Sequence, residues 1–218
     1  MLRPLLVLAP LAAATLLFPR APEPAAEGAG KIALFDGRSL AGWKQFLPDP
    51  KADPAKTWSV KDGVIHCTGT PAGYLRTEKS FRNYFLVVEW RWPANAGNSG
   101  VLLHTQREDK LWPYSVEAQL HSGSAGDFWL IDGATANVDD SRRNPAASIN
   151  VKHLQRAEKP LGEWNRYEIT CLDGNVVLVV NGELVNCGRD ATPDEGAICL
   201  QSEGAPIEFR KVELTPIP

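Results

Sequence analysis

The chain alternates short apolar runs with turn-forming sequences, and polar residues occupy every second position in several of these runs. Three such runs are FLVVEWRW (Phe85 to Trp92), GVLLHTQ (Gly100 to Gln106) and YSVEAQLH (Tyr114 to His121). A period of two is typical of β-strands, because successive side chains of a strand point to opposite faces of the sheet. The pattern therefore predicts strands that carry polar groups on one face.

The carboxy-terminal half predicts a three-stranded antiparallel meander. Its strand candidates and the dipeptides between them are 166–172, Asp173-Gly174, 175–180, Asn181-Gly182 and 183–187. Asp-Gly and Asn-Gly accept the positive φ angles that two-residue hairpin turns require. The segment WSVKDGVIHC also has an Asp-Gly dipeptide, Asp62-Gly63, between two strand-like runs, so a further hairpin is expected there.

The remaining pattern predicts an all-β fold. No segment has an apolar stripe of three helical turns, and residues 142–160 read as a long loop. Ten or more short strands without helices bury their apolar faces by packing one sheet on another. We therefore expect a single domain with the architecture of a jelly-roll β-sandwich.

The amino terminus predicts export. Arg3 precedes an apolar run from Pro4 to Phe18, and residues 19–30 are rich in Pro, Ala, Glu and Gly. This pattern is typical of a signal peptide followed by a linker, so we expect a leader and linker over 1–30, a domain over 31–218, and a periplasmic or extracellular location. An uncleaved leader acting as a membrane anchor is the alternative, and we expect membrane contact only there.

Composition excludes one large class of partner. The 218 residues carry a formal net charge of −3, and the lysines and arginines are dispersed, so the basic patch of a nucleic-acid binder is missing. The four cysteines, Cys67, Cys171, Cys187 and Cys199, allow three disulfide pairings that the sequence does not distinguish. Their spacing matches no zinc motif.

Candidate chemistry lies on the three polar-patterned strands. Glu89 and Arg91 share one strand face, Glu117 and Gln119 share another, and His104 lies between them in sequence. If the strands are neighbours in one sheet, these groups form a polar cleft, and we take Glu89, Arg91, His104 and Glu117 as catalytic candidates. The competing interpretation is that Glu89 and Arg91 pair with each other on the solvent-facing outer side of a sheet, and that Glu117 and Gln119 do the same.

The loops beside these strands supply candidates for substrate binding. NAGNSG (Asn95 to Gly100) and HSGSAGDFW (His121 to Trp129) combine glycines with amide, hydroxyl and acidic side chains, which suits the binding of sugar hydroxyls. Trp112 and Trp129 are candidates for stacking against a sugar ring or another flat ligand. The substrate-binding candidates are Asn98, Trp112, Gln119, His121, Asp127 and Trp129.

An ordered set of motifs resembles one family. LFDGRSLAGWK, GYLRTEKSFRNYFLVVEWRW, NSGVLLH, SVEAQL, AGDFW, GEWNRYEI, VNGELVN and ICLQSEGAPIEFRKVEL occur in this order. The set is similar to the 3-keto-disaccharide hydrolase domain family of exported bacterial proteins, from about Ile32 to Pro216. The resemblance implies a concanavalin A-like jelly-roll sandwich that acts on glycosides already oxidised at C3 of a sugar ring.

The implied chemistry is proton abstraction at C2, β-elimination of the glycosidic oxygen and hydration, which together amount to hydrolysis. Glu117 or Glu89 is the expected base, with Arg91 and His104 near the enolate oxygen and His121 as a candidate proton donor. No cofactor is expected, although a divalent metal held by His104 and one acid is an alternative electrophile. The family pattern often has a histidine or aspartate near Ser202-Glu203 and an acid near His121, and this chain departs from it there.

Two other functions compete with 3-keto-glycoside cleavage. A non-catalytic, lectin-like carbohydrate-binding module uses the same kind of sandwich, and a fold does not determine a function. A glycosidase that uses Glu89 and Glu117 on unoxidised sugars is the third candidate. In all three cases the expected partner is a carbohydrate.

Overall fold

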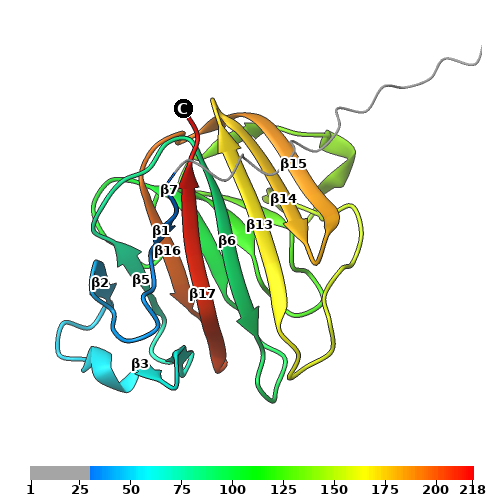
Figure 1. Ribbon diagram of the computed structural model, residues 1–218. Coiled ribbons are helices and arrows are strands. Elements are labelled where there is room, and N and C mark those ends of the chain that lie inside the picture. Colours follow the sequence, from blue (N-terminus) through cyan, green and yellow to red (C-terminus); the bar gives the residue numbers. More distant parts are fainter. Residues whose placement is uncertain (1–29) are drawn as a thin grey trace, which may run out of the picture.

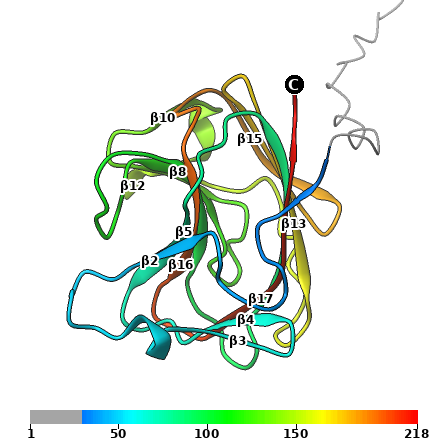
Figure 2. The same ribbon diagram turned by 60° about the vertical axis from the view of Figure 1, so that its left-hand side comes forward.

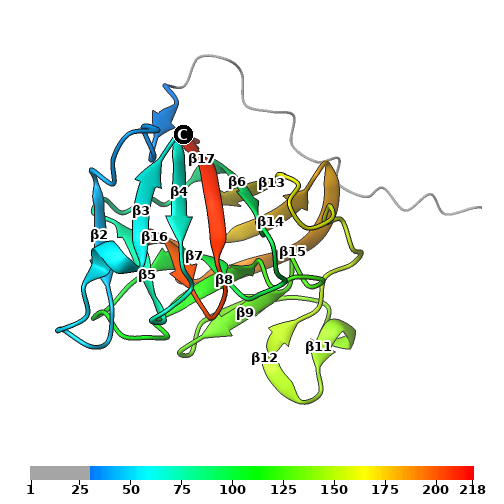
Figure 3. The same cartoon turned by 90° about the horizontal axis from the view of Figure 1, so that it is seen from below.

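The computed structural model describes residues 30–218, which form two antiparallel sheets packed face to face (Figure 1). Seen from below in Figure 3, the strands β17, β6, β13 and β14 form one layer, and β16, β7, β8 and β9 form the other. This arrangement confirms the predicted all-β sandwich. The predicted leader and linker lie outside the described residues, apart from Gly30.

The first sheet has nine strands in the order β10-β15-β14-β13-β6-β17-β4-β3, and β1 also pairs with β17. It forms the face turned toward the viewer in Figure 1. Its strands are β1 (Ile32–Ala33), β3 (Trp58–Lys61), β4 (Val64–Cys67), β6 (Tyr84–Arg91), β10 (Thr135–Asn137), β13 (Asn165–Leu172), β14 (Asn175–Val180), β15 (Glu183–Thr192) and β17 (Ile207–Pro216).

The second sheet has eight strands in the order β11-β12-β9-β8-β7-β16-β5-β2. Figure 2 shows β5, β16 and β8 of this sheet on the side opposite β13 and β17. Its strands are β2 (Trp43–Phe46), β5 (Gly73–Thr77), β7 (Gly100–Thr105), β8 (Ser115–Gln119), β9 (Phe128–Ile131), β11 (Arg143–Asn144), β12 (Ala147–Val151) and β16 (Ala197–Ser202).

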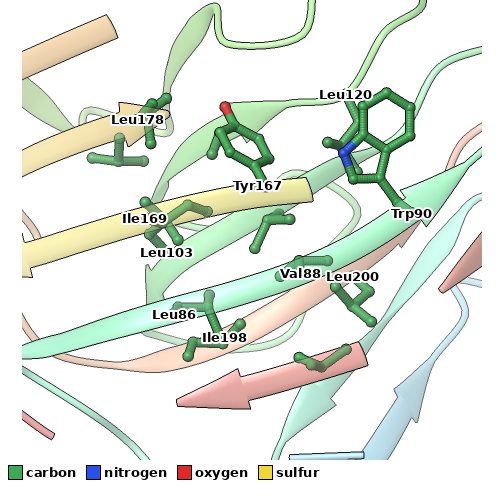
Figure 4. Close-up of a cluster of buried hydrophobic side chains, with 14 of the residues drawn as sticks. Leu86, Val88, Trp90, Leu103, Leu120, Tyr167, Ile169, Leu178, Ile198 and Leu200 are labelled. Carbon is green, nitrogen blue, oxygen red and sulfur yellow. The ribbon is translucent and has the colours of Figure 1, made fainter. Parts of the chain in front are cut away.

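The core lies between the sheets and is built from alternate residues of each strand. Leu86, Val88 and Trp90 of β6 are fully buried, and they pack with Tyr167 and Ile169 of the neighbouring β13 (Figure 4). Leu103, Leu120, Ile198 and Leu200 from the second sheet complete this cluster. Each strand therefore turns its intervening residues toward the outside of the sandwich.

The predicted meander is confirmed as β13, β14 and β15. Asp173 and Asn181, the first residues of its two turns, have φ angles of 47° and 52°. Asp62 has a φ of 53° in the turn between β3 and β4, so the third predicted hairpin is confirmed as well.

The expectation of a long loop over 142–160 is partly wrong. The short 3-10 helix η2 (Asp140–Arg142) leads into β11 and β12, and β12 pairs with β9 at the edge of the second sheet. A second 3-10 helix, η1 (Pro54–Lys56), precedes β3. Because β11 has only two residues and Pro145 separates it from β12, this hairpin has too short a periodic pattern to be recognised from sequence.

Two further features concern the covalent structure and the membrane. All four cysteines are free, and Cys67, Cys171 and Cys199 are buried, so the described residues contain no disulfide. Within residues 30–218 the chain forms no helix with the length and hydropathy that crossing a bilayer requires.

Candidate active site

A pocket of about 750 Å³ opens on the outer face of the second sheet. Its floor comes from β8 and β9. Val116, Ala118 and Phe128 of these strands point into the core, and the residues that alternate with them along each strand point outward. The loop that joins β7 to β8 forms one wall. The lining residues are Asn98, Lys110, Leu111, Trp112, Glu117, Gln119, Trp129, Ile131, Asp132, Ile149 and Glu203.

Glu117 lies at the centre of this floor. Its register neighbours are Leu102 on β7 and Trp129 on β9, and the residue is only 4% exposed. Its Oε1 is buried and has no hydrogen-bond partner among residues 30–218. Burial, and then the nearby charge of Glu203, raise the pKa of Glu117 well above its ordinary value of 4.5. Burial therefore favours the neutral, protonated form of Glu117.

Glu203 supplies a second carboxyl group to the same pocket. It follows β16, and isolated bridges join Asn98 to both Glu203 and Gly204. Burial raises the pKa of Glu203 to about 7, although a hydrogen bond from Asn98 acts in the opposite direction. When the environments of two acids push their pKa values apart, one acid can act as the proton donor and the other as the base.

Gly100 allows Glu117 to lie close to a third polar residue. A Cβ atom at position 100 would be 2.2 Å from Glu117 Oε1 and 2.6 Å from Gln201 Oε1, so both oxygens meet above this glycine. Gln201 is 2% exposed, and neither its Oε1 nor its Nε2 has a partner among residues 30–218. Buried polar atoms without partners are costly, and their grouping at a pocket indicates a binding site for a polar ligand.

The side chain of Gln119 is held at one end of the pocket by the backbone of the two residues that follow it. Its Oε1 accepts hydrogen bonds from the backbone N–H groups of Leu120 and His121, each at 2.9 Å. The side-chain carbonyl is thereby occupied, which leaves the amide nitrogen as the donor available to a ligand. A donor at this place suits a sugar hydroxyl or a carbonyl oxygen.

Ion pairs on both sides hold the loop between β7 and β8 over the sheet. Asp109 accepts hydrogen bonds from Arg76 at 2.6 Å and from the Tyr74 hydroxyl at 2.9 Å. Lys110 pairs with Asp132 at 2.7 Å on the other side. The anchored loop places Leu111 and Trp112 along the pocket wall. These two residues face the same space as Trp129, Ile131 and Ile149.

The structure thus brings together five of the sequence candidates, namely Glu117, Gln119, Asn98, Trp112 and Trp129. Sequence reasoning missed Gln201 as a site residue and gave Glu203 no role. Both follow the apolar run AICL. Their position after a strand-like run indicates that they lie on a sheet, but it does not indicate which face of the sheet they occupy. The departure from the family pattern at Ser202-Glu203 was the one sequence signal that pointed to this place.

The expectation that Glu89 and Arg91 share a cleft with Glu117 is wrong. Both are on β6, which belongs to the first sheet, and they point away from the core on its outer face. Glu89 accepts a hydrogen bond from Arg210 at 2.6 Å, and Arg91 donates one to Glu208 at 2.6 Å. Because the chain crosses between sheets after β6, the whole sandwich separates these ion pairs from the pocket. The competing interpretation is right that both residues lie in ion pairs on the outer side of a sheet, but each pairs with a residue of β17 rather than with the other.

The alternation in the sequence also predicted the wrong strand face for His104. Its φ is 54°, and β7 carries an extra residue relative to β16 between Leu102 and Thr105, so a bulge interrupts the alternation there. The imidazole lies against the Tyr84 ring, with centroids 5.3 Å apart. Its two nitrogens face the carbonyl oxygens of Pro193 and Arg82 at 3.2 and 3.0 Å. Burial lowers the pKa of His104, so a neutral, structural histidine replaces the expected catalytic one.

The remaining candidates, Asp127 and His121, do not line the pocket. Asp127 is 1% exposed and accepts hydrogen bonds from the backbone and the ring of His153, both at 2.7 Å, and from Asn150. These donors, with Lys152, lower the pKa of Asp127 against the opposing effect of burial. Asp127 therefore holds the loop before β9 in place. His121 is exposed in the turn after β8, because the strand ends at Gln119.

The alternative of a metal held by His104 finds no support in this geometry. Both ring nitrogens of His104 face backbone carbonyl oxygens rather than an acid. Among residues 30–218, no three His, Cys, Asp or Glu side chains are grouped as a metal site would require.

Solved structures of carbohydrate-active proteins share the fold. A candidate glycosyl hydrolase from Parabacteroides distasonis is 24% identical, with a TM-score of 0.64 over 87% of this chain and 94% of that chain. A Bacillus licheniformis β-glucanase is 11% identical, with a TM-score of 0.53 over 88% and 100%. A carbohydrate-binding module from Bacillus subtilis is 10% identical, with a TM-score of 0.57 over 79% and 94%. These likenesses confirm the expected concanavalin A-like jelly-roll sandwich.

Sequence comparison gives the family. No curated protein matches the chain significantly. The model of a family described as the 3-keto-alpha-glucoside-1,2-lyase-like domain matches residues 30–215, which is most of the chain and includes every residue that lines the pocket. The chain therefore belongs to this family and is a carbohydrate-active protein of the glycosyl hydrolase-like type.

Proposed function

We propose that this protein is an enzyme that cleaves 3-keto-glycosides by C2 proton abstraction, β-elimination and hydration. The family match supports the substrate class. The observation that carries the proposal is the pair of carboxyl groups that line one pocket, in which burial favours the neutral form of Glu117 and raises the pKa of Glu203 to about 7. Elimination from a ketone uses an ionised base together with a group that stabilises the enolate oxygen, and a neutral carboxylic acid can be that group.

The sugar's ketone determines what the protein must supply. A carbonyl at C3 acidifies the proton on C2, because the carbanion left behind is delocalised onto the ketone oxygen as an enolate. Glu203 is half-buried and is ionised above about pH 7, so it is the group suited to remove this proton. This assignment replaces the earlier choice of Glu117 or Glu89 as the base.

Glu117 has the opposite task. In its protonated form, which burial favours, Glu117 can donate a hydrogen bond to the ketone oxygen and stabilise the negative charge that develops there, and its Oε1 has no competing partner within residues 30–218. A carboxylic acid kept neutral by burial is an effective donor to an enolate. Gln201, whose amide nitrogen is also unpartnered, is a second donor beside it.

The elimination and hydration steps balance without an added reactant other than water. The electron pair of the enolate forms the C1–C2 double bond as the bond from C1 to the glycosidic oxygen breaks. The proton that Glu203 took from C2 passes to the departing oxygen, which leaves as an alcohol and restores the carboxylate. Water then adds its hydroxyl to C1 and a proton to C2, giving the free 3-keto-sugar. Asn98 and Gln119 are placed to orient the ring hydroxyls.

A paired incubation tests this function. Purified protein is given a 3-keto-glycoside and, separately, the unoxidised parent, and release of the alcohol is measured. We expect turnover of the ketone only. Turnover of the parent would replace the proposal with a two-carboxylate glycosidase, and binding without turnover would replace it with a lectin-like module. Glu203→Gln should abolish turnover of the ketone, whereas Glu89→Gln, on the far sheet, should retain it.

We also propose that the protein acts outside the cytoplasm, after export through the leader in residues 1–30. The apolar run from Pro4 to Phe18 supports this proposal. Cell fractionation followed by N-terminal sequencing of the mature chain tests it. A cytoplasmic protein that begins at Met1 would refute it.

A further inference from the structure

The pocket changes character along β8, from a polar end to an apolar end. Alternate residues of a strand are about 6.8 Å apart on one face, so Gln119, Glu117 and Ser115 mark three successive positions. Ile131 is the register partner of Ser115 and Trp129 that of Glu117, whereas Gly100 pairs with Gln119. Since one sugar ring spans about one such step, the pocket has room for a second ring toward Ile131.

The polar end provides the groups that a sugar with a ketone requires. Asn98, Gln119 and Glu203 line it, and Gln201 adjoins it beside Glu117. Several of their polar atoms, including Asn98 Oδ1, have no hydrogen-bond partner in the described part of the chain. The 3-keto ring therefore belongs at this end, with its glycosidic bond near Glu117 and its leaving group toward Ile131.

The second position is lined by apolar side chains. They are Leu111, Trp112, Trp129, Ile131 and Ile149. Trp112 is 43% exposed and Ile149 is 46% exposed, and large apolar residues exposed side by side at a pocket mark a binding surface. Two indole rings on this side offer flat faces to a ring-shaped ligand.

The charged groups at this end are already paired with one another. Lys110 and Arg107 both contact Asp132 Oδ2, at 2.7 and 3.2 Å, and Asp109 is paired with Arg76. A second sugar would lose water from several hydroxyls here without finding free partners, which costs affinity. A neutral aromatic ring needs no such partners and would gain by burial.

We propose that the natural leaving group is a neutral aromatic alcohol, so that the substrate is the 3-keto-glycoside of an aryl or arylalkyl aglycone rather than a 3-keto-disaccharide. This inference rests on the proposed function. Trp112 and Trp129 bind the aromatic ring, and Ile131 and Ile149 close the apolar end.

The test compares two ketones whose leaving groups are both aliphatic alcohols, so that the intrinsic ease of bond cleavage is similar. They are the 2-phenylethyl glycoside of 3-ketoglucose and a disaccharide in which 3-ketoglucose is linked to glucose. Both have the same anomeric configuration at the bond that is cleaved. Turnover is measured with the full-length enzyme, and binding is measured by calorimetry with Glu203→Gln. We expect kcat/KM and affinity to be at least tenfold higher for the phenylethyl compound.

Variants assign the preference to the apolar end. Trp112→Ala, and independently Ile149→Ala, should reduce the preference to less than threefold, because each removes part of the apolar surface that would bind the aromatic ring. Both side chains are exposed, so we expect the variants to fold. Trp164→Ala is the matched control, because Trp164 lies between Arg91 and Arg210 on the opposite sheet, 4.5 Å from each guanidinium. It should leave the preference unchanged.

The outcomes separate this inference from the proposed function. Turnover of both ketones with equal efficiency, or with the disaccharide preferred, overturns the aromatic leaving group and leaves 3-keto-glycoside cleavage intact. Tenfold tighter binding of the phenylethyl compound without turnover by the unaltered enzyme supports the apolar position and overturns the proposed reaction. Binding of neither compound overturns both.

Discussion

Replacing Gly100 by alanine tests whether the position of Glu117 controls turnover. The new methyl group would lie 2.2 Å from Glu117 Oε1 and 2.6 Å from Gln201 Oε1, whereas ordinary contact begins at 3.4 Å. The carboxyl group must therefore move by about 1 Å, a displacement that lowers rates about 100-fold when it affects a reacting group. We expect kcat/KM for a 3-keto-glycoside to fall by about this factor.

The fold should survive this change. The backbone of Gly100 is extended, so alanine is compatible with it, and the crowded atoms are the ends of two side chains. Overpacking costs about 1–3 kcal/mol, and the lower chain entropy of alanine recovers about 0.5 kcal/mol. A net loss of about 0.5–2.5 kcal/mol corresponds to a decrease in Tm of roughly 1–10 °C for a domain of this size.

Kinetics and thermal unfolding are measured together on this variant and on a control. Gly188→Ala is the control, because it adds the same methyl to a strand of the other sheet, 3.2 Å from Val138 and 3.4 Å from Ala136. It should keep the kcat/KM of the unaltered enzyme. Unchanged turnover by Gly100→Ala, with the protein folded, would show that the reaction does not depend on the position of Glu117.

Three further changes address the acids and the far sheet. Because a base acts when ionised, kcat/KM should rise with pH through about 7 as Glu203 loses its proton. The raised pKa also means that the folded state binds this proton more tightly than the unfolded state, so stability falls from pH 4.5 to 7. Glu203→Gln should reduce this fall in Tm, and the remainder belongs to the other carboxyl groups with raised pKa, Glu117 among them. Glu117→Gln should lower kcat about 100-fold or more by loss of the acid proton, yet raise Tm at pH 8; a lower Tm would contradict the raised pKa of Glu117. Arg91→Gln should change neither kcat nor KM, and a loss of activity with the fold intact would return Arg91 to the reaction.

Local patterns were sufficient to predict several of the strands and the faces of β6 and β8. The alternation of β8 correctly placed Glu117 and Gln119 together on the face opposite Val116 and Ala118. The turn dipeptides predicted the meander because Asn-Gly and Asp-Gly have a local conformational preference that tertiary contacts did not override. These predictions rest on neighbours in sequence.

Which residues meet at the site depends on the pairing of strands that are far apart in the sequence, and no local pattern contains this information. Consecutive strands β6 and β7 belong to different sheets, so Glu89 and Glu117 are separated although both alternations were read correctly. A single extra residue in β7 turned His104 into the sandwich. Glu203 reached the pocket through the pairing of β16 with β7, between segments far apart in the sequence.

The placement of Glu117 makes sense only if it serves a ligand. Burial destabilises an acid in its charged form, and proteins usually relieve this with a neighbouring cation. Lys110, a cation that lines the pocket, is bound to Asp132 instead, and the charge that acts on Glu117 is that of another acid, Glu203. Both choices keep the proton on Glu117 at a cost to stability. A group that is kept protonated, unpartnered and open to a pocket is ready to donate a hydrogen bond to an oxygen that becomes negative during the reaction, which the enolate of a 3-keto-sugar provides.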